Sequence, residues 1–399
     1  MAQPRSNETS STRIETIDLL RGLVMIIMAL DHVRMYFGLG TWYAEPTNLA
    51  TTTPLLFFTR WITHFCAPVF VFLAGTSAFL YNIKRENVRE TAWFLLTRGL
   101  WLVLMELVVV SFAWTFDVTY SFLILQVIWA IGLSMVVLSA LILLPRKLIF
   151  ITGMILVFGH NLLDPVSVGD VPLPDILWYT LHQPGSVFLD GRLINFAYPI
   201  LPWIGLMALG YVFGGLYQNG FPPEKRRQWL LRIGIGAMLL FILLRAFNLY
   251  GEPREWQTQA SPLFTLMSFL NTTKYPPSLH FLLMTMGPAL IFLATVERLR
   301  DRLPTPVITF GRVPFFFYIV HLYVIHAFAM LLLVVQGWEA SEYILSARGI
   351  MSGNLRDFGL GLEAVYLIWI VVIVLLYPLC RWYQKFRQDH PSKWWLSYL

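Results

Sequence analysis

The sequence has few charged residues and few cysteines for its length. Only 13% of its 399 residues are Asp, Glu, Lys or Arg, against about 25% in ordinary soluble domains. Cys66 and Cys380 are its only cysteines, and both fall in apolar runs. Neither a disulfide framework nor a cysteine-based metal site is therefore expected. The sequence also has no hydrophilic stretch long enough to form a separate soluble domain.

The opening of the chain lacks the features of a cleavable secretory signal. MAQPRSNETSSTRIET is polar and has no apolar core before Ile17, whereas such signals carry an apolar stretch near their start. We therefore expect residues 1–15 to form a flexible cytosolic tail. The rest of the chain is predicted to be a single transmembrane domain over 16–386, followed by a second cytosolic tail over 387–399.

The sequence is rich in long apolar runs. Hydrophobic residues make up 57% of the chain, and a run of about 20 crosses a hydrocarbon core of roughly 30 Å. Ten such spans are predicted, at 17–39, 54–81, 91–114, 120–143, 146–163, 196–217, 229–250, 278–296, 308–336 and 361–384. We expect an all-α integral membrane protein, a polytopic bundle of about ten transmembrane helices.

The distribution of basic residues predicts the orientation of this bundle. If the N-terminus is cytosolic, only five of the 29 basic residues fall in outer segments, namely Arg192, Arg254, Lys274, Arg348 and Arg356. Basic residues are enriched in the cytosolic loops of membrane proteins. We therefore predict both termini in the cytosol, and the net charge of +6 does not indicate a nucleic-acid partner.

Ionisable and amide side chains interrupt several predicted spans at a similar depth. At about 1.5 Å per residue, the outer half of the bilayer holds Asp31, His32, His64, Glu106, Gln126 and His321, with Arg34 and Arg60 near its rim. Such groups are costly in lipid and usually face the interior of the bundle. They predict a water-filled cavity that opens outward.

A structural explanation of the same residues stays open. Asp31 and Arg34 are three residues apart on one helical face, where an ion pair that locks helices together forms readily. His321 points away from the next histidine of its span, so no metal site is expected. Pro68 cannot donate a hydrogen bond to the carbonyl oxygen of His64, which predicts a kink beside that histidine.

Three arginines lie near the inner ends of their spans. Arg21 stands three residues after Asp18, so the two side chains are expected to pair on one helical face. Gly22, directly after Arg21, permits close helix packing. Arg98 and Arg312 also stand next to glycines at this depth. Arginines around an inner vestibule are suited to bind the phosphates of an anionic donor. They are equally suited to extend toward lipid phosphates.

Five blocks of sequence together resemble bacterial membrane proteins related to the catalytic domain of heparan-α-glucosaminide N-acetyltransferase. They are RIETIDLLRGLVMIIMALDHVRMYF, RWITHFCAPVFVFLAGTSAFL, YPILPWIGLMALGYVFGG, NTTKYPPSLHFLLMTMGPAL and FGRVPFFFYIVHLYVIH. The resemblance implies acyl transfer from cytosolic acetyl-CoA or another acyl-CoA to an outer-facing sugar or glycan acceptor, in a bacterial inner (plasma) membrane. One departure is that the position of a histidine taken as catalytic in the lysosomal enzyme falls near Thr53 and Pro54.

The resemblance and the residues together predict the catalytic groups. His64 or His32 is expected to act as general base on the acceptor, with Asp31 orienting or charging the imidazole. His321 is expected to stabilise the developing oxyanion or to relay a proton. Cys66 is turned away from the face of His64, which favours direct transfer from the thioester over a covalent acyl-enzyme.

The remaining predicted contacts are with the two substrates. The donor acyl-CoA is assigned to Arg21, Arg98 and Arg312. The acceptor is assigned to Arg34, Arg60, Glu106, Gln126, Lys274 and His280.

Membrane lipids are further partners, and the sequence allows a homodimer. The alternative function is a proton-coupled transporter or exporter, which the lack of visible inverted repeats disfavours; a non-catalytic scaffold explains the ionisable residues least well.

Overall fold

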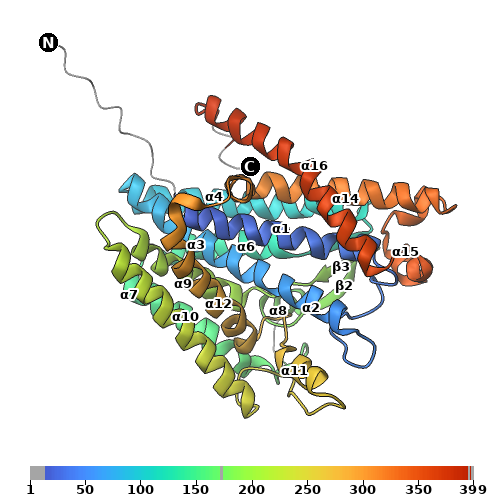
Figure 1. The fold of residues 1–399 in the computed structure, drawn as a ribbon, viewed down its shortest axis with the longest axis horizontal. Helices are drawn as coiled ribbons and strands as arrows, with labels where there is room; N and C mark the ends of the chain where they lie inside the picture. Colours follow the sequence, from blue (N-terminus) through green and yellow to red (C-terminus); the bar gives the residue numbers. More distant parts are fainter. Residues whose placement is uncertain (1–13, 171–173, 394–395, 397–399) are drawn as a thin grey trace.

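The computed structural model describes residues 14–170, 174–393 and 396, so nearly all of the predicted tail 1–15 and five residues of the predicted tail 387–399 lie outside the described residues. The chain forms a bundle of helices with one small sheet (Figure 1). The α-helices of the first half are α1 Glu15–Phe37, α2 Pro54–Ile62, α3 Cys66–Arg85, α4 Val88–Met105, α5 Ser111–Thr115, α6 Val127–Leu141, α7 Arg146–Gly159 and α8 Asp175–Leu181. Those of the second half are α9 Leu201–Phe213, α10 Pro223–Ala246, α11 Pro262–Leu270, α12 Leu279–Val296, α13 Thr305–Arg312, α14 Pro314–Val335, α15 Ala347–Ser352 and α16 Leu362–Asp389.

Shorter elements join these helices. The strands are β1 Phe122–Leu125, β2 Gly185–Leu189 and β3 Arg192–Phe196. The 3₁₀ turns are η1 Thr63–Phe65, η3 His160–Leu163, η4 Gly214–Tyr217, η5 Glu297–Arg302, η6 Ala340–Tyr343 and η7 Asn354–Asp357, and one π-helical turn is η2 Glu106–Val110. We call the end where α1 begins the amino end, and the opposite end, which carries the sheet, the sheet end (Figure 1).

The protein is an all-α polytopic membrane protein. In the described part of the chain, seven helical segments are long and apolar enough to cross a bilayer: Pro54–Arg85, Val88–Thr115, Arg146–Leu163, Pro223–Ala246, Leu279–Leu299, Pro314–Val335 and Leu362–Asp389. The three other predicted spans correspond to α1, which carries several charges, and to the shorter apolar helices Val127–Leu141 and Leu201–Tyr217. The number ten stays a prediction.

Several predicted spans are broken where the backbone chemistry requires it. The kink predicted beside His64 is the turn η1, which separates α2 from α3 two residues before Pro68. The predicted span 308–336 is two helices, because a residue before proline avoids the helical conformation and Val313 stands before Pro314 with φ −131° and ψ 50°.

The sheet corrects two predicted helix starts. The span predicted from 120 begins instead as β1, which pairs in parallel with β3, and β3 pairs antiparallel with β2. The span predicted from 196 starts at α9, because β3 ends at Phe196. Residues 122–125 read Phe-Leu-Ile-Leu, which suits a buried strand as well as a lipid-facing helix, so hydropathy alone could not distinguish them.

Close backbone contacts hold α1 at the centre of the bundle, against α3, α13, α14 and α16. A Cβ added at Gly22 would lie 1.9 Å from the carbonyl oxygen of Val307, and one at Gly311 would lie 1.8 Å from that of Asp18. Small residues let two backbones approach in this way inside a membrane. The packing role predicted for Gly22 is therefore confirmed.

We expect Gly22→Ala to destabilise the protein by about 1–3 kcal/mol, the usual cost of overpacking a filled interior. The clash is with backbone, so no side-chain rotation relieves it. The matched control is Gly236→Ala in α10, where an added Cβ meets nothing within 4 Å. The midpoint of thermal unfolding in detergent measures both; equal midpoints for the two variants would contradict the tight crossing.

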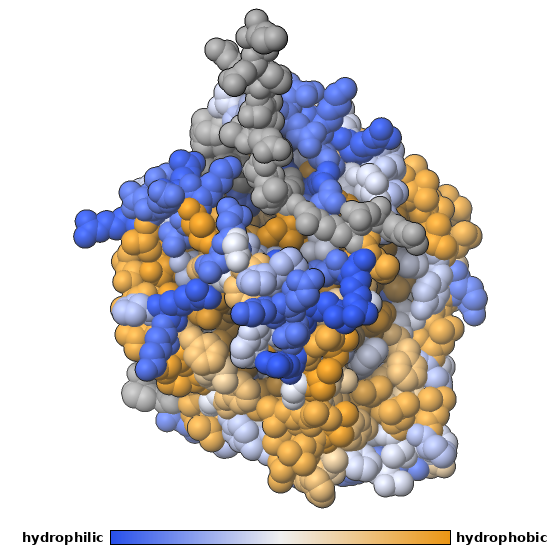
Figure 2. Space-filling model, turned by 60° about the vertical axis from the view of Figure 1, so that its left-hand side comes forward, coloured by the Kyte–Doolittle hydropathy of each residue, from blue (hydrophilic) through white to orange (hydrophobic). Residues whose placement is uncertain are grey.

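The surface of the molecule separates polar from apolar side chains. Large apolar side chains are exposed on α10 and α16, for example Leu239, Leu243, Leu367 and Val374. Figure 2 turns the amino end toward the viewer and shows hydrophilic side chains gathered there, with hydrophobic side chains on the flanks. This pattern fits flanks that contact lipid and an end that contacts water.

Candidate functional site

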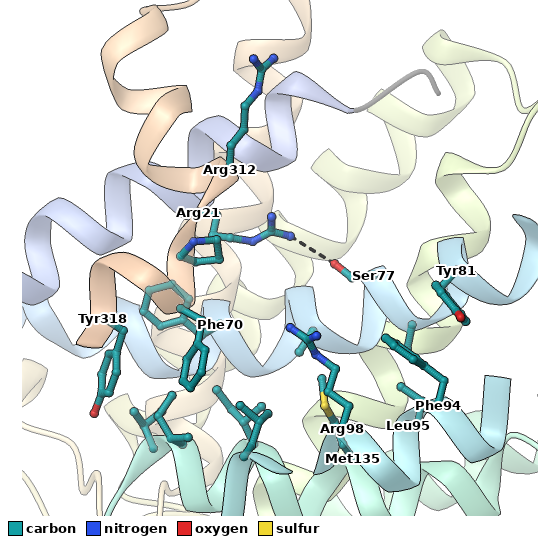
Figure 3. Close-up of a pocket in the computed structure, with 18 of the residues that line it drawn as sticks. Arg21, Phe70, Ser77, Tyr81, Phe94, Leu95, Arg98, Met135, Arg312 and Tyr318 are labelled. Carbon is teal, nitrogen blue, oxygen red and sulfur yellow. Dashed lines mark hydrogen bonds between the residues drawn. The ribbon is translucent and has the colours of Figure 1, made fainter. Parts of the chain in front are cut away.

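A cavity of about 670 Å³ opens among α1, α3, α4, α6 and the junction of α13 with α14; we call it the arginine pocket. Its basic lining residues are Arg21, Arg85, Arg98, Arg312 and Arg387. The three arginines predicted to bind the donor are thus brought to one cavity from three separate helices (Figure 3). Sequence reasoning missed Arg85 and Arg387 because both were read only as charges of inner segments.

Arg21 is held in place by several neighbours. Its guanidinium donates to Asp18 Oδ1 at 3.1 Å, to the carbonyl oxygen of Gly311 at 3.1 Å and to Ser77 Oγ at 3.2 Å (Figure 3). The predicted pair of Asp18 and Arg21 is therefore confirmed. Each contact comes from a different helix, so the position of this charge depends on the folded bundle.

Arg312 and Arg98 lie on other walls of the same pocket. Arg312 donates to Glu15 Oε1 at 3.0 Å, and its Nε lies 3.6 Å from Asp18 Oδ2. The Arg98 guanidinium lies 5.9 Å from the centre of the Phe94 ring. Asp18 therefore stands between two of the three arginines and holds them near each other.

The lining of the arginine pocket is partly basic and partly apolar. Its apolar side chains include Met25, Phe70, Val127, Ile128 and Phe315. In Figure 3, Tyr318 and Phe70 lie at the opposite side of the view from Tyr81 and Phe94. A second cavity of about 1140 Å³ shares Arg21, Ser77 and Tyr81 with the first and continues it at the amino end.

Tyr318 connects the arginine pocket to a pair of histidines. It lines the pocket, and its ring centre lies 5.6 Å from that of His321 and 6.3 Å from that of His32. His32 Nδ1 and His321 Nε2 are 2.6 Å apart. The sequence placed these two histidines at one depth, and the structure brings them into direct contact.

The hydrogen bonds of this histidine pair assign its tautomers. The partner of His321 Nδ1 is the carbonyl oxygen of Phe317, at 2.9 Å. Because a carbonyl oxygen can only accept a hydrogen bond, Nδ1 of His321 carries the proton and donates the hydrogen bond. A neutral His321 then accepts at Nε2, and the Nδ1–H of His32 donates to it. The lone pair left for a substrate proton is on Nε2 of His32. His32 keeps 9% of its surface exposed, whereas His321 is fully buried.

Asp31 makes its side-chain hydrogen bonds to arginines, and none to an imidazole is found among the described residues. The orienting role predicted for it therefore has no support, whereas its charge does act on His32. Asp31 Oδ1 accepts from Arg34 Nη2 at 3.0 Å, and its Oδ2 accepts from Nη1 of Arg60. The structural alternative is therefore the observed one for Asp31 and Arg34. Arg34 is 4% exposed, so it is not at an open cavity rim. Arg60 also lies 3.4 Å from Thr63 Oγ1.

His64 is close to this charged group but not bonded into it. It is 3% exposed, its ring packs 5.2 Å from that of Phe281, and its Nδ1 has no hydrogen-bond partner among the described residues. Neither ring nitrogen contacts the His32–His321 pair. The two histidines predicted as alternative bases thus stand in different settings, and only His32 has a proton-relay partner.

Lys274 faces the same region from the loop before α12. Its Nζ lies 5.2 Å from the ring centre of Tyr275 and 6.0 Å from that of Tyr198, and its charge acts on Asp31. Burial raises the pKa of Tyr198 well above its usual value. Burial also raises the pKa of Tyr275, but the charges of Lys274 and Arg60 outweigh it and hold that pKa below its usual value.

Glu106 and Gln126 form a structural contact. Glu106 is fully buried in the π-helical turn η2, and its Oε1 accepts from the backbone N–H of Gln126 at 2.7 Å. Gln126 directly precedes α6, whose first N–H groups have no partner within the helix. The carboxyl of Glu106 therefore caps the junction of β1 and α6, and the acceptor-binding role predicted for both residues has no support in this arrangement.

His280 is also placed apart from the histidine pair. Its Nε2 lies 3.2 Å from the carbonyl oxygen of Tyr250, and its ring packs against Phe241 of α10. Nearby, Arg245 donates to the carbonyl oxygens of Phe269, Ser268 and Asn271 and so closes the end of α11. The depth predicted for His280 stays a prediction, and its acceptor-binding role has no support in these contacts.

One comparison with known proteins is positive. The family model described as heparan-alpha-glucosaminide N-acetyltransferase, catalytic, matches residues 13–246, which is more than half of the chain. The match includes Arg21, His32 and Arg98, and it ends before Arg312 and His321. No curated protein matches the chain.

Proposed function

Because the chain belongs to the heparan-alpha-glucosaminide N-acetyltransferase catalytic family, we propose that it transfers an acyl group, most simply acetyl, from acyl-CoA to a sugar or glycan. Membership of a transmembrane acetyltransferase family follows from the match and the apolar helices. The donor, the acceptor and the direction are our proposal: acyl-CoA enters from the cytosol at the amino end, and the acceptor binds at the sheet end.

The shape and charge of the arginine pocket support acyl-CoA as the donor. Acyl-CoA carries phosphates at one end and a thioester at the other, joined by a flexible arm. Arg21, Arg98 and Arg312 suit the phosphates, since guanidinium groups bind them in a bidentate manner. The apolar part of the pocket suits the arm, and the adjoining cavity gives room for the nucleotide.

The position of Tyr318 is the observation that carries the proposal. This side chain lines the arginine pocket and also contacts both His32 and His321. An acyl thioester that fills the apolar part of the pocket would therefore reach the histidine pair from the amino end. An acceptor that approaches His32 from the sheet end would meet it there.

These positions support direct transfer. Nε2 of His32 removes a proton from the acceptor amine or hydroxyl while its nitrogen or oxygen bonds to the thioester carbonyl carbon. The carbon–sulfur bond then breaks, and the CoA thiolate leaves with the electron pair and takes up the proton. His321 accepts the Nδ1–H hydrogen bond of His32 throughout, and this fixes the imidazole orientation.

The charges near His32 favour an acidic acceptor. Arg34, Arg60 and Lys274 carry three positive charges near the carboxylate of Asp31, and Glu45 is a further acid whose charge acts on Arg34. The excess positive charge stabilises an anion that binds near it. Lys274 is the residue of this group that no acid pairs with among the described residues, so we assign to it the carboxylate or sulfate of an acidic sugar.

The test uses sealed proteoliposomes with radiolabelled acetyl-CoA outside and hexosamine acceptors, neutral and acidic, enclosed. We expect labelled acetyl-sugar inside the vesicles and faster labelling of acidic acceptors. The same protein in detergent solution is the control for sidedness, because both substrates then reach both sides of the protein.

Three results would contradict the proposal or part of it. Lack of any transfer in detergent across the acceptor panel would remove the enzymatic function. Proton-driven uptake of label in vesicles that hold no acceptor would favour the transporter instead. Stable labelling of the protein itself would replace direct transfer by an acyl-enzyme.

A further inference from the structure

Three metal-ligating side chains meet at the sheet end, away from the arginine pocket and the histidine pair. They are His160 at the start of η3, Asp164 directly after η3, and His182 directly after α8. One ligand atom from each lies within 4.8 Å of the others. From this cluster we propose a binding site for a divalent transition-metal ion, for which zinc has the best-matched chemistry.

The distances suit a tetrahedral ion. Zinc binds imidazole nitrogen and carboxylate oxygen at about 2.0–2.2 Å, which places neighbouring ligand atoms about 3.3 Å apart. His182 Nε2 and Asp164 Oδ1 are 3.2 Å apart. His160 completes the set after a small side-chain rotation, because its ligand atom is within 4.8 Å of both.

Unpartnered nitrogens point to a ligand independently of the spacing. His160 and His182 are each 3% exposed. Both ring nitrogens of His160, and Nδ1 of His182, have no hydrogen-bond partner among the described residues. Buried polar atoms are normally satisfied. A metal ion would use one lone pair of His160, so it accounts for a nitrogen that the protein leaves unpaired.

The side-chain amide of Asn161 orients the carboxylate of Asp164 toward the proposed metal site. Asn161 Nδ2 donates to Asp164 Oδ2 at 2.8 Å, and Asn161 Oδ1 accepts from the backbone N–H of Leu279 at 3.0 Å. Such outer contacts orient metal-binding side chains. They leave Asp164 Oδ1 directed at His182, and the Asp164 side chain is 23% exposed, which gives an ion a route in from solvent.

The ligand set selects the ion class and leaves one position open. Two imidazoles and one carboxylate suit zinc and similar ions rather than calcium or magnesium, which prefer oxygen ligands. Three protein ligands leave a fourth position to water. A bound ion would fasten η3 to the end of α8 and, through Asn161, to the start of α12. The expectation of no metal site from the sequence rested on His321 and the next histidine of α14, and it did not consider His160, Asp164 and His182 together.

The experiment loads the purified full chain, stripped with chelator, with zinc or with cobalt. We expect about one zinc per chain by elemental analysis, visible d–d absorption from cobalt, and a higher midpoint of thermal unfolding with zinc, since an ion that binds only the folded state stabilises it. His160→Ala, His182→Ala and Asp164→Asn should each abolish stoichiometric zinc. Asn161→Ala should weaken binding by about ten- to a hundredfold.

His390→Ala is the matched control, because His390 lies after α16 and its Nδ1 contacts the carbonyl oxygen of Phe386. It should bind zinc like the wild type. Size-exclusion profiles show which variants are folded, and the cobalt spectrum of the wild type needs no variant. Absence of cobalt bands and of stoichiometric zinc in the wild type would leave only a direct contact of His182 with Asp164 and overturn the proposal, whatever the transfer assay shows.

Discussion

His32→Ala should lower kcat for acyl transfer by roughly 10²–10⁴-fold, the usual contribution of a general base, with the KM for acyl-CoA little changed. The reason is that Nε2 of His32 carries the available lone pair of the histidine pair. The rate of the wild type should fall as pH is lowered and this imidazole takes up a proton. The variant should lose that acidic limb of its pH–rate profile.

Two further variants separate this role from a structural one. His64→Ala removes a buried imidazole in the same region that has no bond to the histidine pair, so we expect less than about a tenfold loss and an unchanged pH profile. His321→Gln keeps an acceptor for the Nδ1–H of His32 and should retain more activity than His321→Ala. If His64→Ala shows the larger loss and removes the acidic limb, the base is His64 and our assignment is wrong.

Arg98→Ala should raise the KM for acetyl-CoA by about ten- to a hundredfold with a smaller change in kcat. A hydrogen bond to a charged group contributes about 1.5–3 kcal/mol, and a factor of ten corresponds to about 1.4 kcal/mol. Arg98 is the sharpest choice of the three, because Arg21 and Arg312 both contact Asp18 and their loss would also disturb the crossing of α1 and α13.

The donor itself provides the control for Arg98. Acetyl-pantetheine has the thioester and the arm but no phosphate, so Arg98→Ala should leave its KM unchanged. Arg98→Lys keeps the charge but loses the bidentate geometry and should fall between the wild type and Arg98→Ala for acetyl-CoA. Arg89→Ala, on the same helix but outside the pocket lining, should behave as the wild type. An equal rise in KM for both donors would show that Arg98 acts through packing.

The local breaks in the helices were predictable because their causes are local. Pro68 and Pro314 act within about one helical turn along the chain. The kink beside His64 was predicted in this way, whereas the break before Pro314 was not predicted although its cause is equally local. The strand β1 was not predicted, because it forms only when β3 is present to pair with it. A lipid-facing helix and a buried strand can have the same apolar composition, so hydropathy did not reveal that residues 122–125 form a strand.

The sequence by itself determined the membrane class, the packing role of Gly22 and the pair of Asp18 with Arg21, because these depend on hydropathy, residue size and spacing along one helix. Tertiary structure decided which residues of equal depth meet. It brought His32 into contact with His321, and it paired Asp31 with two arginines. It also placed the Glu106 carboxyl at the start of α6 and packed His280 of α12 against α10. Depth is a property of one helix, whereas the facing of two helices depends on how the whole bundle packs.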